Sequence, residues 1–366
     1  AAEEIIAKTC VTRGYCLDLA CGDGGLALEL ARRTELMVYG IDHDPVQVRA
    51  AREMLDRAGL YGTRVVILEG DPAHPPFPDY LADLLVSARS AAGAGKMPEK
   101  RQYERMLRPC GGVACLGTPG AMQTWARGAV AGAGEWTHQN TDPANSFCSP
   151  DTAVRGPLEM LWCRDTDLVM CNRHGRPPAP LVAEGRMFVE GLHALRAVDL
   201  YNGRTLWEYP LENVLLTYHR EHSIGAAWAG SNFCLAGGSL YVHTGRRCLR
   251  LDTKTGRRIA EYPVPSLPGG QPGTWAYIAC DGRHLSGSLA DEDYLVRCWS
   301  PNWDTSGQFI ESKLLFALDP GSGKMLWTYV PKDSIRNNAI AVAEGRVYLI
   351  DRPVADADHL RYPIAE

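Results

Sequence analysis

A short stretch near the start of the chain combines an acid with an unusually bare backbone. The sequence CLDLACGDGG, residues 16–25, begins as an apolar run that contains Asp18. It then breaks into glycines, among them Gly22 and Gly24, with Ala20 between the acid and the first glycine. Glycines let the backbone approach a ligand closely, and a helix that follows such a turn offers free N–H groups. The pattern therefore favours a turn that binds a nucleotide-like ligand.

Two further acids stand where the next strands of such a unit would end. Asp42 closes the apolar run LMVYGI, and Asp71 follows the run TRVVILEG. A carboxylate at Asp42 can accept two hydrogen bonds from the hydroxyl groups of a ribose. The letters GDGGLA also satisfy the dinucleotide pattern G-x-G-x-x-A, so the residues by themselves leave two classes of nucleotide cofactor open.

Strands and helices alternate over the first part of the chain, up to about Met122. Apolar runs that are typical of buried strands are YCLDLA, LMVYGI, TRVVILEGD, YLADLLVSA and GGVACLG. Between them lie the helical patterns GLALELARR, DPVQVRAAREMLDRAG and PEKRQYERML. This alternation predicts a parallel sheet with helices on both faces.

Five motifs in this region resemble those of class I S-adenosylmethionine-dependent methyltransferases. They are D-x-A-x-G-x-G from Asp18, the acid Asp42 in VYGIDHD, Asp71 in LEGDP, DLLVSA from Asp83, and LRPCGG at 107–112. The resemblance implies that the glycine turn holds the amino-acid end of S-adenosylmethionine, Asp42 the ribose and Asp71 the adenine. The implied cofactor-binding residues are Asp18, Ala20, Gly22, Gly24, Asp42 and Asp71.

No catalytic residue is identified by these motifs. Several subfamilies end their fourth strand in an Asn-Pro-Pro-Tyr type motif that orients a substrate amine, whereas this chain has SARSAAG there. Ser87, Arg89 and Ser90 lie in the corresponding place without indicating a mechanism. Little sequence follows GGVACLG before the pattern changes, so we expect no room for the last two strands that the family usually has.

The second half of the chain repeats itself. LRAVDLYNGRTLWEYPL starts at Leu195, CLRLDTKTGRRIAEYPV at Cys248 and LFALDPGSGKMLWTYVP at Leu315, with Asp, Gly and Tyr at matching places. A second recurring piece carries a glycine turn, at Gly185, Gly238, Gly282 and Gly345. Each unit predicts four strands, with an Asp-x-x-x-Gly turn before the last of them, which is typical of a propeller blade.

These units resemble pyrroloquinoline-quinone-type (PQQ-like) repeats, and EWTHQNTDPANS from Glu135 resembles the segment by which the chain enters such propellers. We expect three complete blades and the start of a fourth, so that the natural protein continues beyond Glu366 to close a ring. Trp207, Trp327 and the repeated tyrosines Tyr209, Tyr262 and Tyr329 are expected to pack between neighbouring blades. Quinone-dependent dehydrogenases with such repeats hold the cofactor beside a calcium ion and often beside a disulfide between adjacent cysteines. This chain has no adjacent cysteine pair and no evident acidic calcium site, so no PQQ is expected.

Together the patterns predict α/β plus all-β architecture in one chain. The expected domains are a Rossmann-like methyltransferase domain over residues 1–122, a linker over 123–134, and a partial PQQ-like β-propeller over 135–366. A formal net charge of −5 gives no electrostatic argument for nucleic acid, and no apolar stretch is long enough to span a membrane. The 12 cysteines form no CxxC pair, so no metal site is expected.

The predicted function is methyl transfer from S-adenosylmethionine to an unknown protein or small-molecule acceptor, with the propeller as a docking module for a partner or substrate. Two alternatives remain: a non-catalytic scaffold with a degenerate methyltransferase domain, and a quinone-dependent dehydrogenase. The domain order resembles large bacterial proteins that are often exported. That resemblance implies a periplasmic location, whereas the cytoplasmic origin of the cofactor favours the cytoplasm.

Overall fold

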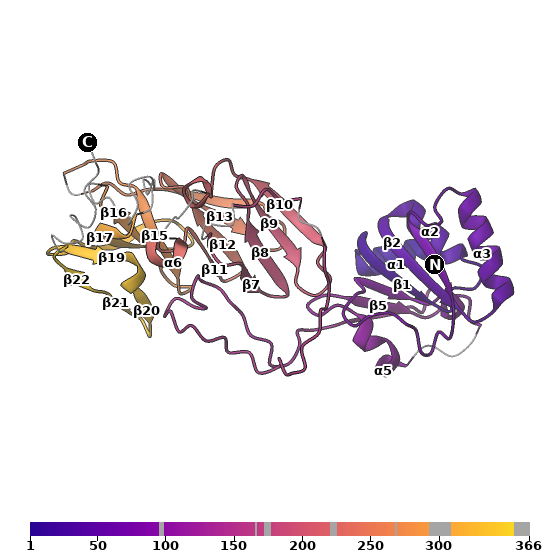
Figure 1. The fold of residues 1–366 in the computed structure, drawn as a ribbon. Coiled ribbons are helices and arrows are strands. Elements are labelled where there is room, and N and C mark those ends of the chain that lie inside the picture. The colour runs from indigo at the N-terminus through magenta and orange to yellow at the C-terminus, as the bar shows by residue number, and fades with distance from the viewer. Residues whose placement is uncertain are drawn as a thin grey trace. The chain divides into compact units, whose positions relative to one another are not determined.

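The computed structural model divides the chain into two compact units (Figure 1). The N-terminal unit comprises residues 1–131 and 158–162, and the repeat unit comprises residues 132–157 and 163–366. The structure describes residues 1–94, 99–164, 167–171, 177–219, 225–267, 269–292 and 309–354.

A six-stranded sheet in the order β3-β2-β1-β4-β5-β6 forms the framework of the N-terminal unit. Its strands are β1 (Arg13–Leu19), β2 (Glu35–Asp42), β3 (Val65–Glu69), β4 (Leu84–Val86), β5 (Val113–Leu116) and β6 (Gln123–Ala126). The first five strands are parallel, and β6 runs antiparallel to β5. The strand order reverses between β1 and β4, and ligands of open α/β sheets bind at the carboxyl ends of the strands beside such a reversal.

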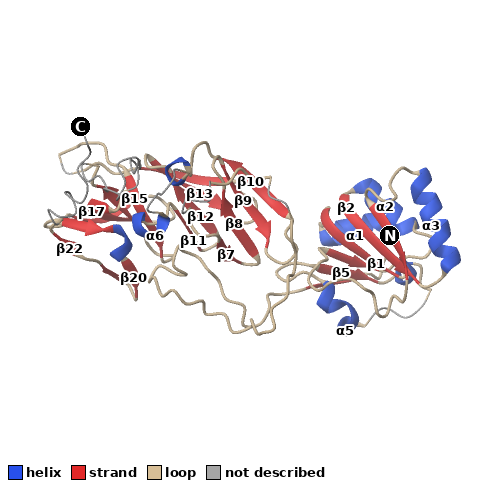
Figure 2. Cartoon of the chain, in the orientation of Figure 1, coloured by secondary structure: helices blue, strands red, loops and turns tan. Residues whose placement is uncertain are grey.

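Helices cover both faces of this sheet, as the sequence predicts (Figure 2). They are α1 (Ala2–Thr9), α2 (Gly25–Arg33), α3 (Pro45–Arg57), α4 (Ala88–Ala91), α5 (Lys100–Tyr103) and the 3-10 helix η1 (Glu104–Met106). In β1, Cys16 packs into the cluster with α1, α2 and α3, while Leu17 and Leu19 pack on the other face with α5 and η1. No helix in the described part of the chain combines the length and apolar composition needed to pass through a bilayer.

Strand β6 lies in the segment that the sequence assigns to a linker, so the expectation of no room for a further strand is wrong for one strand. Its residues are mostly exposed, so no apolar pattern marks it. Backbone pairing with β5 forms it instead, and the Trp125 ring lies 6.3 Å from that of Tyr103. Arg127 fixes its end by donating to the carbonyl oxygens of Glu104 and Leu107 at 2.6 and 2.7 Å.

Within its described residues, the repeat unit contains three four-stranded antiparallel repeats and a hairpin that begins a fourth. The first repeat comprises β7 (Leu181–Ala183), β8 (Arg186–Glu190), β9 (Ala194–Asp199) and β10 (Thr205–Pro210). The second comprises β11 (Phe233–Ala236), β12 (Ser239–His243), β13 (Arg247–Asp252) and β14 (Arg258–Pro263). The third comprises β15 (Trp275–Cys280), β16 (Leu285–Ala290), β17 (Glu311–Leu318) and β18 (Met325–Tyr329), and the hairpin is β20 (Ala341–Ala343) with β21 (Arg346–Tyr348).

Short elements complete the repeat unit. Strands β19 (Ser334–Arg336) and β22 (Asp351–Arg352) extend the third sheet beside β17. Between the first and second repeats lie the 3-10 helix η2 (Leu216–Tyr218) and helix α6 (Ala226–Ala229), and η3 (Asn337–Ala339) precedes β20. The central part of the predicted insertion in the third repeat and the last residues of the chain lie outside the described residues.

The predicted Asp-x-x-x-Gly turns join the third and fourth strands of each repeat. In the second turn the Asp252 carboxylate accepts from the Thr255 N–H at 2.8 Å, and in the third Asp319 accepts from the Ser322 N–H at 2.7 Å. The turn glycines have φ values of +70°, +69° and +72° at Gly203, Gly256 and Gly323, a conformation that favours glycine.

Aromatic side chains connect neighbouring repeats through these turns. Trp207 of the first repeat donates from Nε1 to the Thr253 carbonyl oxygen at 3.0 Å. In the second repeat, where Ala260 stands in the tryptophan position, Tyr262 takes over and donates to the Pro320 carbonyl oxygen at 2.7 Å. Trp327 of the third repeat is 36% exposed, so the packing that the sequence predicts for it is incomplete within the described residues.

Residues 135–145, which we call the bracing segment, run along the first strands of the repeats and do not join any sheet as a regular strand. Trp136 exchanges two backbone hydrogen bonds with Val182 of β7, and the Thr137 carbonyl oxygen accepts from Leu235 of β11. His138 is buried and accepts from the Cys280 N–H of β15 at 3.1 Å. Burial lowers the pKa of His138 to about 4, so the ring is neutral and can act as this acceptor near neutral pH.

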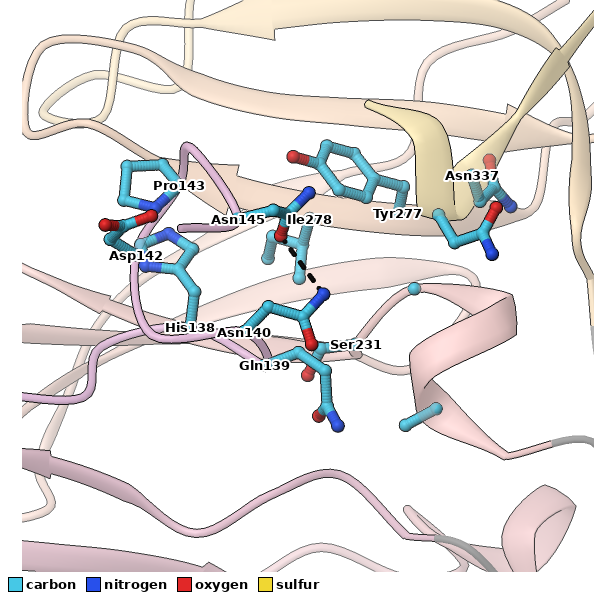
Figure 3. Close-up of a pocket in the computed structure, with 13 residues that line it drawn as sticks. His138, Gln139, Asn140, Asp142, Pro143, Asn145, Ser231, Tyr277, Ile278 and Asn337 are labelled. Carbon is cyan, nitrogen blue, oxygen red and sulfur yellow. Dashed lines mark hydrogen bonds between the residues drawn. The ribbon is translucent and has the colours of Figure 1, made fainter. Parts of the chain in front are cut away.

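The end of the bracing segment reaches the hairpin of the fourth repeat. The Pro143 carbonyl oxygen accepts from the Val342 N–H at 2.7 Å, and the Asn145 side chain donates to the Ile340 carbonyl oxygen at 2.7 Å. Figure 3 shows this end of the segment, with Asn140 donating to Asn145. A cavity of about 20 Å³ lies among these side chains, which is room for a water molecule. The segment therefore contacts all three repeats and the hairpin that begins the fourth.

Candidate functional site

An open cleft of about 440 Å³ lies at the carboxyl ends of the strands of the N-terminal unit. Ala20 and Leu19 line it from the end of β1, and His43 lines it after β2. Asp71 enters from the loop after β3, and Ser87 and Arg89 from the end of β4. Glu99 and Gln102 complete the lining from the beginning of α5. The cleft is thus built from the edge at which the sequence places its candidate residues.

The glycine turn brings bare backbone to the end of β1. Gly22 has φ +55°, and a Cβ atom built there would meet no atom within 4 Å. Gly24 has φ +78° and precedes α2, and a Cβ atom there would lie 3.0 Å from Cβ of Ala51 on α3. Gly22 therefore leaves space beside the turn, whereas Gly24 allows the turn to pack against a helix.

Asp18 is buried directly behind the turn. One of its carboxylate oxygens, Oδ1, accepts from the Ala88 N–H at 2.8 Å, while the other, Oδ2, has no hydrogen-bond partner. Burial raises its pKa to about 7, the Ala88 N–H lowers it, and the negative charge of Asp42 raises it further. Burying a carboxylate oxygen without a hydrogen-bond donor lowers the stability of the folded protein. A bound ligand that donates to this atom would offset that cost.

Asp42 is also fully buried, and its carboxylate holds the glycine turn in place. Its Oδ2 atom accepts from the Gly22 N–H at 2.9 Å, and Oδ1 accepts from the Asp44 N–H at 3.1 Å. Nη2 of Arg89 lies 3.3 Å from both oxygens. The acid that the sequence assigns to the ribose is thus paired within the protein.

Asp71 lies at the exposed side of the cleft. Its carboxylate interacts with Nδ1 of His74 at 2.8 Å and accepts from the Ala73 N–H at 2.9 Å. The hydrogen bond with His74 lowers the pKa of Asp71, and the Ala73 N–H lowers it further. Asp71 is therefore ionised near neutral pH and stands at the mouth of the cleft as an acceptor.

The structure gathers the six candidate residues at one edge but gives them different positions. Ala20 and Asp71 line the cleft, Asp18 and Asp42 are buried behind it, and the two glycines shape the turn. Sequence reasoning placed Arg89 near the site but missed its pairing with Asp42. That pairing follows from the structure, in which β4 pairs with β1 and brings the residues after β4 next to the turn.

The fourth-strand motif acid, Asp83, does not face the cleft. It is buried at the other end of β4, where it accepts from the Tyr15 N–H at 2.9 Å and from Nε of Arg108 at 2.7 Å. This motif acid therefore joins β4 to β1 and to the turn before β5. Among the described residues, the cysteines are free thiols, and no group of three or more His, Cys, Asp or Glu side chains is arranged to hold a metal ion.

Replacing Asp18 with asparagine is expected to reduce the pH dependence of the stability of the N-terminal unit. The folded unit keeps a proton up to the raised pKa of about 7, whereas the unfolded chain releases it near the ordinary value of 3.8. The contribution of protonated Asp18 to the free energy of unfolding is therefore fully present below about pH 4, and it is lost as the pH rises through about 7. The uncharged amide of Asp18→Asn removes this loss.

Thermal unfolding followed by the helical circular dichroism signal measures this effect, because α1, α2 and α3 belong to the N-terminal unit. Between about pH 5 and pH 8 the melting temperature of the wild type is expected to fall by roughly 5 °C more than that of Asp18→Asn. Asp23→Asn, which changes an exposed acid in the same turn, serves as the control and should retain the wild-type slope. Equal slopes for all three proteins would contradict a buried, proton-bearing Asp18.

Two known families match separate stretches of the chain. Residues 16–111 match the family "Methyltransferase domain". Residues 159–276 match the PQQ-type family "Outer membrane protein assembly factor BamB". The prediction of a Rossmann-like methyltransferase domain followed by PQQ-like repeats is thereby confirmed.

Individual relatives match shorter stretches. The 27-O-demethylrifamycin SV methyltransferase of Amycolatopsis mediterranei is 33% identical over 102 residues, which is 27% of this chain and 36% of that protein. Ajmaline N-methyltransferase of Rauvolfia serpentina is 35% identical over 71 residues, 19% of this chain and 24% of that protein. The chain thus spans less than half the length of either relative. Among solved structures, a europium-containing methanol dehydrogenase has a TM-score of 0.38 at 17% identity, covering 54% of this chain and 32% of that one.

Proposed function

We propose that the N-terminal unit binds S-adenosylmethionine and transfers its methyl group to an acceptor. The family match over residues 16–111 and the similarity to known methyltransferases support this function. The observation that carries it is the placement of two fully buried carboxylates, Asp18 and Asp42, behind a glycine turn at the carboxyl ends of β1 and β2.

The donor and acceptor groups of this edge fit the proposed cofactor. The unpaired Oδ2 atom of Asp18 lacks a donor, and the ammonium group of an amino acid is one. The open space beside Gly22 allows the ligand to lie against the turn. Asp42 would accept from the ribose hydroxyls, and the ionised Asp71 would accept from the adenine amino group. When bound, the cofactor supplies a methyl group on a positively charged sulfur.

Methyl transfer also requires the acceptor atom to be aligned with the methyl group. The cleft extends from the turn to Ser87, Glu99 and Gln102, which we propose face the acceptor. The Gln102 side chain accepts from the Glu99 N–H at 2.7 Å, which fixes its orientation. In this proposal the unit acts mainly by positioning, because alignment of two reactants by itself accelerates such a transfer.

Calorimetric titration of the full chain with S-adenosylhomocysteine tests cofactor binding. We expect one binding event per chain for the wild type and at least about tenfold weaker binding for Gly22→Ala, whose methyl group enters the space beside the turn. Gly62→Ala is the matched control. Gly62 also has a positive φ with no atom near a built Cβ, but it lies in the turn before β3.

Both glycine variants should be destabilised by about 1 kcal/mol, so that only the difference in binding reports on the site. Absence of binding to the wild type at millimolar ligand, in the presence of normal folding, would exclude the methyltransferase function. That result would favour the non-catalytic scaffold, for which the pairing of Asp42 with Arg89 already provides one argument.

For the repeat unit we propose a docking role for a partner or for the methyl acceptor. The bracing segment supports this role, because its contacts connect the first strands of three repeats with the hairpin that begins the fourth. Repeats that are held together in this way can form an extended surface for a partner.

A further inference from the structure

We propose that Arg89 acts as a latch on the cofactor site. In the free protein its guanidinium pairs with the Asp42 carboxylate and keeps it from the ribose, and this pair opens when the ligand binds. This inference rests on the proposed function of the N-terminal unit. It assigns Arg89 a positioning role that acts on affinity through Asp42, and it predicts that the native arginine weakens cofactor binding.

The hydrogen-bond capacity of Asp42 is the first argument. A carboxylate offers about four acceptor positions. The Gly22 and Asp44 N–H groups use two, and Nη2 of Arg89 lies 3.3 Å from each oxygen. The acceptor positions of Asp42 are therefore already in use. Two ribose hydroxyls can donate to this carboxylate only if one of the present donors moves away.

Only one of these donors is free to leave without unfolding the site. The N–H groups of Gly22 and Asp44 belong to backbone that the glycine turn and the beginning of α3 hold in place. The Arg89 side chain is flexible and 39% exposed, and its guanidinium approaches Asp42 through a single nitrogen at a long distance. Such a partly exposed ion pair is weak and can open.

Burial gives a second, independent argument. Asp42 is 0% exposed, so no ligand hydroxyl reaches it unless a covering group moves. Arg89 lines the cleft, and its guanidinium bonds the hidden carboxylate. His43 also lies beside Asp42, with Nδ1 3.4 Å from Oδ1 of the carboxylate. Its ring is 60% exposed, so it covers Asp42 less than a buried side chain would. The Arg89 side chain is therefore the cover whose displacement uncovers the acid.

The backbone around Arg89 remains fixed while its side chain moves. The Arg89 N–H donates to the Ala20 carbonyl oxygen at 3.1 Å, and the preceding Ala88 N–H donates to Asp18. These bonds keep the end of β4 attached to the glycine turn. Opening the latch thus requires only a rotation of the Arg89 side chain. Because the ligand binds only the open molecules, the apparent affinity equals the affinity of the open form multiplied by the fraction of molecules that are open.

Titration of the full chain with 5′-methylthioadenosine tests the latch. This probe has the ribose and adenine but no carboxylate, so it cannot interact with a released arginine as an anion. Arg89→Ala is expected to bind it about tenfold more tightly than the wild type does. Arg13→Ala is the matched control, because it removes another arginine–acid pair, with Glu35, at the opposite ends of β1 and β2. It should bind like the wild type.

Arg89→Gln provides a second variant that retains the length of the side chain, and circular dichroism establishes that each variant is folded. Salt provides an independent measurement, since ionic strength screens the pair but not the uncharged probe. Wild-type affinity for the probe is expected to rise a few-fold between low and high salt, and that of Arg89→Ala is expected to stay constant.

The possible outcomes separate the latch from the proposed function. Tighter binding of the probe by the Arg89 variants than by the wild type supports the latch. Equal or weaker binding by these variants, with a wild type that does bind, overturns the latch and leaves the cofactor site intact. Absence of binding by every variant, with S-adenosylhomocysteine as well as with the probe, overturns the proposed function and the latch with it.

Discussion

Gly256→Ala is expected to lower the free energy of unfolding of the repeat unit by about 3 kcal/mol. Gly256 has φ +69°, and a Cβ atom built there would lie 2.6 Å from the Trp207 ring. That ring cannot easily withdraw, because it is 9% exposed and its Nε1 donates to the Thr253 carbonyl oxygen. The methyl group therefore adds a clash between two repeats to the strain of the left-handed backbone.

A second glycine variant separates these two contributions. Gly238→Ala has the same kind of backbone strain, with φ +70°, but a Cβ atom there would meet nothing within 4 Å. Its cost should be about 1 kcal/mol, so the difference from Gly256→Ala reports on the contact with Trp207. Urea unfolding followed by tryptophan fluorescence measures both variants. Equal costs for the two variants would show that Trp207 does not pack on the turn of the second repeat.

The same contact shows how far the repeat pattern predicts packing. Aligned copies place Trp207 opposite Ala260, so in the second repeat only the repeated tyrosine remains of the two aromatic residues expected to connect repeats. In the structure this tyrosine, Tyr262, makes the connection; it lies two residues further along β14, where side chains share one face of the strand. A Cβ atom at Gly323 would lie 2.3 Å from this ring. The pattern predicts the turn, but which aromatic side chain reaches it depends on how the sheets stack.

A comparable limit applies to the cofactor site. The alternation of strands and helices predicts that Asp18 and Asp42 lie near one edge, because parallel strands end together. It does not predict their burial, nor that Arg89, 47 positions from Asp42, lies beside it. Such partners depend on the pairing of β4 with β1 and on the side-chain conformation of Arg89. Strand β6 escaped prediction for another reason, since backbone pairing rather than apolar burial forms it.

Asp42→Asn is expected to weaken the binding of S-adenosylhomocysteine by about 100-fold. Two hydroxyl hydrogen bonds to a buried carboxylate would become bonds to an amide that has one acceptor oxygen. Hydrogen bonds to charged groups contribute about 1.5–3 kcal/mol each, so losing much of two such bonds accounts for this factor. The substitution also leaves either the Gly22 or the Asp44 N–H without an acceptor, which should destabilise the N-terminal unit by about 1–2 kcal/mol.

Asp23→Asn controls for the loss of a negative charge in the turn, because the Asp23 side chain is exposed and accepts only from the nearby Gly25 N–H among its described contacts. It should bind the ligand within about twofold of the wild type. Calorimetric titration measures affinity, and urea unfolding establishes that the variants are folded under the same conditions. Wild-type affinity in Asp42→Asn would mean that the ribose does not use this carboxylate.

Combining Asp42→Asn with Arg89→Ala distinguishes the direct role of the acid from that of its cover. If Arg89 acts on affinity only by closing Asp42, its removal strengthens binding in the wild-type background and has no effect once the carboxylate is gone. The two effects should then be non-additive, as expected for side chains in direct contact. An equal gain from Arg89→Ala in both backgrounds would show that the arginine opposes the ligand directly, so that the acid and the guanidinium act on the cofactor independently.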